Sequence, residues 1–151
     1  MKKHRAIIFI AILLIITGIM TMIHLRTREE VPEGAIEVTS GEDTSIVDIT
    51  ELSYETVTGI RVNGKGEEIE VEASGILLKD VLEGVGVTKA DKVSVLADDS
   101  YRAELTWEEI MEPSRAYLIQ EEGETRLRLL VFGDKDSKRS VSNVAQIIIE
   151  E

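Results

Sequence analysis

The stretch of sequence that decides the fold reads YETVTGIRVNGKGEEIEVE and spans residues 54–72. Its first half is rich in β-branched and aromatic residues, and Asn63-Gly64-Lys65-Gly66 has the composition of a tight turn. The last part alternates between glutamate and aliphatic residues, which places Glu68, Glu70 and Glu72 on one face. We therefore predict a β-hairpin whose glutamates form its solvated face.

The residues that follow the hairpin have helical rather than strand periodicity. Leu77 with Val81, and Leu78 with Leu82, recur at a spacing of four, and charged residues occupy the opposite face. Gly84 follows as a stop signal. The spacing predicts an amphipathic helix over residues 76–83.

The remainder of the chain has mostly strand signals. Thr106 and Pro113 bracket a short helix predicted at 107–111, since threonine is a good N-cap and proline ends helices. Short strands are predicted at 35–39, 92–97, 101–105, 116–120, 126–132 and 144–149. The sum is an α+β fold, a mixed and mostly antiparallel sheet of about seven short strands with one main helix.

An uncharged run from Ala6 to Ile23 precedes this domain, and the basic residues Lys2, Lys3 and Arg5 precede the run. As a helix the run would be about 27 Å long, close to the thickness of a bilayer core. It lacks a small-x-small cleavage site, which favours an uncleaved signal anchor over a cleaved signal peptide. The positive-inside rule then favours a C-terminal domain outside the cytoplasm.

We predict three segments from these patterns. Residues 1–28 form a single-pass anchor that contacts the membrane through residues 6–23, and residues 29–44 form an acidic linker. Residues 45–151 form the folded domain. The predicted localisation is the cell membrane.

Composition excludes several kinds of site. The chain has no cysteine, and its two histidines, His4 and His24, precede the folded domain, so thiolate zinc sites, iron–sulfur clusters and serine–histidine triads are excluded there. Residues 29–151 contain 12 basic and 29 acidic residues, a net charge of −17. Such a surface repels phosphates, so no nucleic-acid partner is expected.

Four segments resemble the molybdopterin-binding domain of sulfite-oxidase-type oxidoreductases. Residues 75–87, GILLKDVLEGVGV, resemble the family's G-V-P-L-x-D-L-L-x-x-A-G-V helix. Residues 93–105, 128–133 and 139–144 are similar to its V-x-x-x-A-x-D-G-Y-x-x-x-L, R-L-V-V-P-G and R-x-V-K-x-V runs. The matches occur in order and cover roughly residues 46–151. This chain is identified as resembling a short, cysteine-free member, which implies that family's fold over the domain.

The resemblance also implies a molybdopterin cofactor, and the departures from the family bear on that implication. The family's catalytic members bind molybdenum through a cysteine, which this chain lacks. Ser142 stands where the family has lysine, and Phe132 stands where it has proline. Arg128 is the one recognisable basic position that remains. The resemblance therefore leaves the cofactor open and puts catalysis in doubt.

The candidate cofactor-binding residues are the cations near the last strand and one tyrosine. They are Arg128, Lys135, Lys138, Arg139 and Tyr101. Arginine can bind a phosphate with two parallel hydrogen bonds, and the 133–139 loop carries three cations in a very acidic domain. The alternative is that Arg128 pairs with acids on the wet face of its strand and that the loop is simply solvated.

Three functions remain open. The first is a membrane-anchored extracytoplasmic module that binds a partner without catalysis. The second is a pterin-dependent oxidoreductase without a cysteine metal ligand. The third is a cell-envelope interaction domain with an envelope protein as its partner. The arrangement of the four cations should separate these hypotheses, because a phosphate-bearing cofactor needs a positive pocket.

Overall fold

The computed structural model describes residues 2–27 and 31–151, which belong to two separate units, 1–30 and 31–151. The first unit contains one helix, α1 (Lys2–Thr27). From Ile7 to Met22 its large hydrophobic side chains are at least half exposed on every side. Residues 1 and 28–30, which the predicted anchor and linker include, lie outside the described residues.

The prediction of a membrane-spanning helix is contradicted. Among the residues that the structure describes, no helix is both long and apolar enough to cross a membrane. The predicted signal anchor and the single-pass localisation are therefore wrong, whereas the membrane contact through residues 6–23 stays a prediction.

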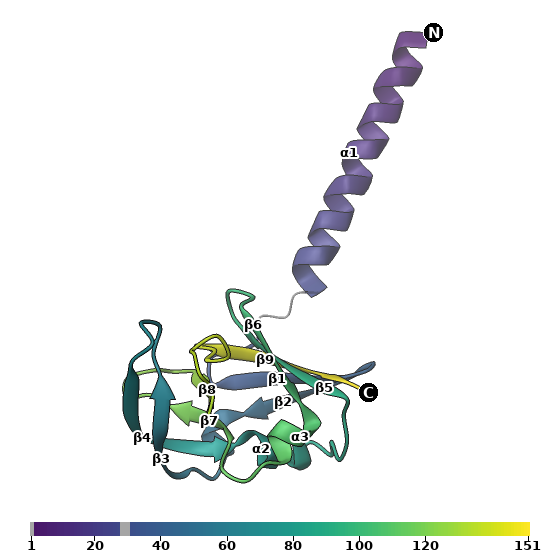
Figure 1. Ribbon diagram of the computed structural model, residues 1–151. Helices are drawn as coiled ribbons and strands as arrows, with labels where there is room; N and C mark the ends of the chain where they lie inside the picture. Colours follow the sequence, from purple (N-terminus) through teal and green to yellow (C-terminus); the bar gives the residue numbers. More distant parts are fainter. Residues whose placement is uncertain (1, 28–30) are drawn as a thin grey trace. The chain divides into compact units, whose positions relative to one another are not determined.

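Within residues 31–151, nine strands form two sheets (Figure 1). The first sheet has the order β2-β1-β9-β5-β6, and its strands are β1 (Ala35–Ser40), β2 (Asp43–Asp48), β5 (Lys92–Ala97), β6 (Arg102–Thr106) and β9 (Val144–Glu150). The second has the order β3-β4-β7-β8, with β3 (Glu55–Val62), β4 (Glu68–Leu77), β7 (Ala116–Gln120) and β8 (Leu127–Val131). Neighbouring strands are antiparallel except β1 and β9, which are parallel.

The predicted α+β class, with one sheet and one main helix, is wrong because this unit is mostly β with two sheets. Its helical elements are short: η1 (Ile49–Glu51), α2 (Leu78–Gly84) and α3 (Trp107–Met111). The helix predicted at 76–83 begins two residues later, at Leu78, because Ile76 and Leu77 are the last residues of β4, where they pair with β7. An apolar run at a strand-to-helix junction fits the pattern of a buried strand as well as that of a helix.

The compact unit begins at Val31, so the folded part extends into the predicted linker 29–44. Strand β1 lies inside the first sheet, between β2 and β9. Ile36 and Val38 are buried there, while β2 is an exposed edge strand. The strand predicted at 35–39 is therefore present as β1, but it belongs to the folded unit and not to a linker.

Several local predictions are confirmed. Strands β5 and β7 have the predicted bounds, and β3 pairs with β4 as the predicted hairpin. Helix α2 ends at Gly84, and the turn that follows it contains Gly86, which has a φ of +87°; the N–H of Val87 donates to the C=O of Leu82 at 3.0 Å. That left-handed position is the one that needs glycine.

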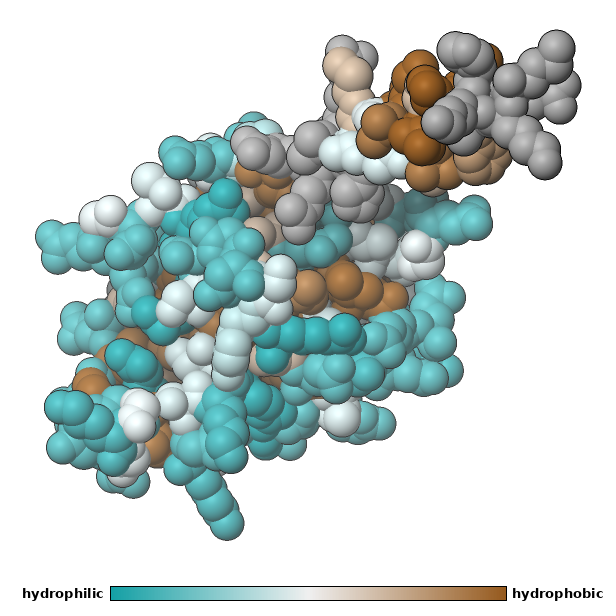
Figure 2. All heavy atoms as spheres, turned by 90° about the horizontal axis from the view of Figure 1, so that it is seen from above, coloured by the Kyte–Doolittle hydropathy of each residue, from teal (hydrophilic) through white to brown (hydrophobic). Residues whose placement is uncertain are grey.

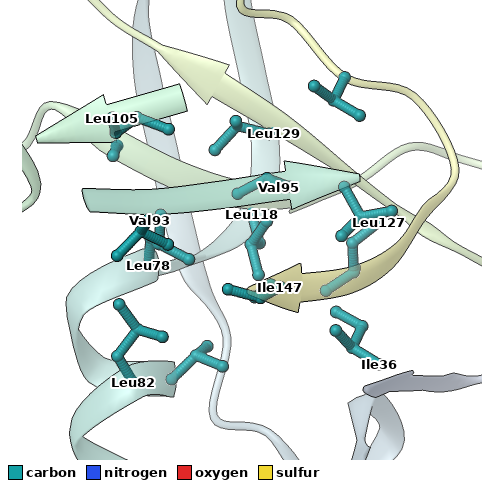
Figure 3. Close-up of a cluster of buried hydrophobic side chains, with 14 of the residues drawn as sticks. Ile36, Leu78, Leu82, Val93, Val95, Leu105, Leu118, Leu127, Leu129 and Ile147 are labelled. Carbon is teal, nitrogen blue, oxygen red and sulfur yellow. The ribbon is translucent and has the colours of Figure 1, made fainter. Parts of the chain in front are cut away.

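The main hydrophobic core lies between the two sheets and the short helices (Figure 3). Val95 and Ile147 contribute from the first sheet, Leu118 and Leu129 from the second, and Leu78 from α2, and all five are fully buried. The other face of the second sheet carries a smaller cluster of Val57, Tyr117, Ile119 and Leu130. The second sheet therefore has apolar side chains on both faces.

Candidate functional site

Arg139, the last residue of the 133–139 loop, is held by two carboxylates. Its Nε donates to Oδ2 of Asp134 at 2.8 Å, and its Nη1 donates to Oε1 of Glu109 at 2.8 Å. All three side chains are at most about one quarter exposed. These contacts strongly raise the pKa of Arg139, chiefly through the hydrogen bond with Asp134.

Glu109 connects this loop to α3. Its carboxylate accepts from the N–H of Thr106 at 3.0 Å, and the hydroxyl of Thr106 accepts from the N–H of Glu109, so the two residues form a capping box. Arg115 lies 3.1 Å from the same carboxylate. Burial alone would raise the pKa of Glu109, but the hydrogen bonds from Thr106 and Arg139 and the charges of Arg139 and Arg115 lower it overall.

Arg128 is also paired. Its Nε lies 3.0 Å from Oε2 of Glu121, and its Nη1 donates to Oγ of Ser140 at 3.4 Å. The segment around Ser140 runs along β8, where Leu129 and Val141 exchange backbone hydrogen bonds. Pairing with an acid on the strand face is the alternative that the sequence left open for this residue.

Tyr101 and Lys138 meet through the backbone. The hydroxyl of Tyr101 donates to the C=O of Lys138 at 2.6 Å, which connects the β5–β6 turn to the loop. The side chain of Lys138 is 84% exposed, and its ammonium lies 3.5 Å from a carboxylate oxygen of Asp136. The N–H of Lys138 donates to Asp136, and this hydrogen bond lowers the pKa of that carboxyl.

Lys135 lies apart from these contacts. It lines a shallow groove of about 740 Å³ with Phe132 and with Gly59 of β3. The ring of Phe132 packs over Gly59 and meets the ring of Tyr117 edge-on, with the centroids 5.8 Å apart.

The five predicted residues therefore do not form a positive pocket. Arg128, Lys138 and Arg139 each lie beside a carboxylate, and Tyr101 donates its hydroxyl proton to the backbone. Over the described ranges, no group of three or more His, Cys, Asp or Glu residues could hold a metal ion. These residues do not fit a phosphate-bearing pterin, because the anionic partners already beside the cations would repel the phosphate.

A second groove, which the sequence did not single out, lies beside β4. It measures about 670 Å³, and we call it the β4 groove. Residues 69–74 of β4 form one side and the turn 121–124 forms one end. Its apolar side chains are Ile69, Val71, Ala73 and Ile119, and its carboxylates are Glu70, Glu72, Glu121, Glu122 and Glu124.

The alternation of Glu68, Glu70 and Glu72 is the sequence signal for this groove, but the same alternation is also typical of an ordinary solvent face. The partners of Arg139 had a partial signal, because Thr106 and Glu109 have the spacing of a capping box. No sequence pattern indicates that Asp134 or Arg115 takes part in this network.

No protein-family model and no curated protein sequence matches this chain.

Proposed function

We propose that residues 31–151 form a non-catalytic binding module that recognises a partner protein. The observation that carries this proposal is the pairing of Arg139 with Asp134 and Glu109. That pairing makes the most basic loop of the domain part of its internal framework. An arginine held in this way supports a rigid scaffold and does not offer its donors to a phosphate.

The surface chemistry also supports a binding role. Most of the face of this unit seen in Figure 2 is hydrophilic, with small hydrophobic patches. The domain carries a large negative charge, which favours basic partners and increases their rate of encounter. Serine and threonine nucleophiles lack a histidine base in residues 31–151.

The test uses the full-length protein, produced in a host that makes molybdenum cofactor. Metal analysis and pterin fluorescence after oxidation should show molybdenum and pterin far below one per chain. A sulfite-oxidase-type enzyme purified from the same host serves as the loading control. Stoichiometric molybdenum that survives washing with about 1 M salt, where surface charges are screened, would overturn the proposal in favour of an oxidoreductase.

A further inference from the structure

We propose that the β4 groove binds an extended, basic segment of a partner protein, which adds to β4 as a further strand. This inference rests on the proposed function and names the partner class. It comes from three properties of the groove: an unpaired strand edge, unpaired carboxylates and an apolar strip.

The first property is an unpaired stretch of sheet edge. Strand β4 pairs with β3 over Glu68–Gly75, but it pairs with β7 only over Ser74–Leu77. Within the described part of the chain, residues 68–73 therefore have a strand on one side only. Figure 1 shows the β3–β4 hairpin extending past β7 at this end of the sheet.

The free edge presents backbone groups to the groove. The N–H of Asn63 donates to the C=O of Glu67 at 2.9 Å, so these two residues form a hydrogen-bonded pair of the hairpin. Hydrogen-bonded and non-hydrogen-bonded pairs alternate along antiparallel strands, so Ile69, Val71 and Ala73 point their backbone N–H and C=O groups toward β3. Glu68, Glu70 and Glu72 then turn theirs away from β3. Six residues of free edge span about 20 Å, enough for an added strand of about six residues.

The second property is charge. Glu70, Glu72, Glu122 and Glu124 form no ion pair within the described residues, and all four are exposed. Glu121 is paired with Arg128, and Arg61 is the cation that lines the groove. Most of the charge in the β4 groove is therefore negative and uncompensated, which favours lysine or arginine in the segment that binds there.

The third property is the position of the apolar side chains. Ile69, Val71 and Ala73 occupy one face of β4, and the glutamates occupy the other. Ile69 is 38% exposed although it is a large aliphatic residue. Side chains on neighbouring strands pair on the same face, so an added strand needs basic residues opposite the glutamates and aliphatic residues opposite Ile69 and Val71. The expected pattern is alternating basic and aliphatic residues.

A second copy of this chain does not satisfy these requirements. Pairing two β4 edges would place Glu68, Glu70 and Glu72 against the same residues of the other copy. Like charges directly opposite each other destabilise a sheet. The occupant is therefore a basic segment of a different protein.

The experiment measures binding of synthetic peptides to the full-length protein by fluorescence anisotropy at low salt. A ten-residue peptide of alternating lysine and valine should bind, and its affinity should fall as salt is raised. A glutamate–valine peptide should not bind. A lysine–valine peptide with every backbone nitrogen methylated should bind at least about tenfold more weakly, because it cannot donate to a strand edge.

Matched variants locate the site. The double variant Glu70→Gln, Glu72→Gln should weaken binding about fivefold, since each exposed charge contributes modestly. Glu42→Gln with Glu51→Gln removes two exposed carboxylates elsewhere and should leave the affinity unchanged. Binding should also slow hydrogen exchange at the amides of Glu70 and Glu72.

Equal binding of the methylated peptide would overturn strand addition, and an equal loss in both double variants would overturn the location. If no peptide binds, this inference fails. The proposed binding module fails separately, through the metal and pterin measurement.

Discussion

Arg139 and Glu109, which are 30 residues apart in sequence, are joined by a hydrogen bond of 2.8 Å from Nη1 to Oε1. Glu109 belongs to the capping box of α3, and Arg139 ends the loop that follows β8. The pair therefore holds the start of a helix against the loop that follows β8. Asp134 and Arg115 extend the same network.

The variant Arg139→Met should lower the free energy of unfolding by about 1–3 kcal/mol, because it leaves Asp134 and Glu109 partly buried without their main partner. Lys138→Met is the matched control on the same loop. The Lys138 side chain is 84% exposed, so the expected change is within about 0.5 kcal/mol. Urea unfolding followed by circular dichroism measures both, and equal effects would show that the network is not stabilising.

The stability of the domain should depend on pH through Glu109. Its pKa is lowered in the folded state relative to the ordinary value of 4.5, so the unfolded chain binds this proton more readily. The stabilisation is fully present above that ordinary value and is lost as pH falls through the lower folded value. Urea midpoints between pH 6 and pH 3 should fall less steeply for Glu109→Gln than for the wild type, and parallel curves would contradict the assignment.

Local patterns predicted much of this fold because strands and caps depend on neighbouring residues. The alternation in 67–72 and the turn at Asn63–Gly66 predicted the hairpin, and Thr106 predicted the start of α3. The division into two sheets depends instead on which strands pair. The pairing of β1 with β9 joins Val38 to Ile147 across most of the chain, and no local pattern encodes it.

The candidate site also depends on contacts between distant residues that local sequence patterns do not predict. The 133–139 loop was identified from its charge, but charge alone does not say whether a cation faces solvent, a ligand or an acid. In the structure Arg139 faces two acids, because it donates hydrogen bonds to Glu109 and Asp134. The free edge of β4 arises because β7 ends at Gln120, which is a property of the sheet and not of the β4 sequence.

The core position of α2 can be tested at Leu78, which is fully buried. Leu78→Ala should cost about 2–5 kcal/mol, the range for removing a buried leucine side chain. Ile46→Ala removes a comparable aliphatic side chain from the edge strand β2, where it is 56% exposed. It should cost less than about 1 kcal/mol, because little apolar area returns to water. Thermal unfolding of both variants gives the comparison, and a small effect at Leu78 would remove α2 from the core.

The last prediction concerns the close approach of strands at Gly75. A Cβ added there would lie 2.8 Å from Cγ2 of Val57 and 3.0 Å from Cγ2 of Ile119. Both neighbours are buried in the second cluster, so they have little room to move. Gly75→Ala should therefore destabilise the domain by about 1–3 kcal/mol through overpacking.

Gly84→Ala is the matched control, because a Cβ at Gly84, in α2, meets no atom within 4 Å. It should be neutral or stabilise by up to about 1 kcal/mol, since alanine favours the helix. Urea unfolding of the two variants decides the matter, and a neutral Gly75→Ala would mean that β3 and β7 can separate from β4 at this point without cost.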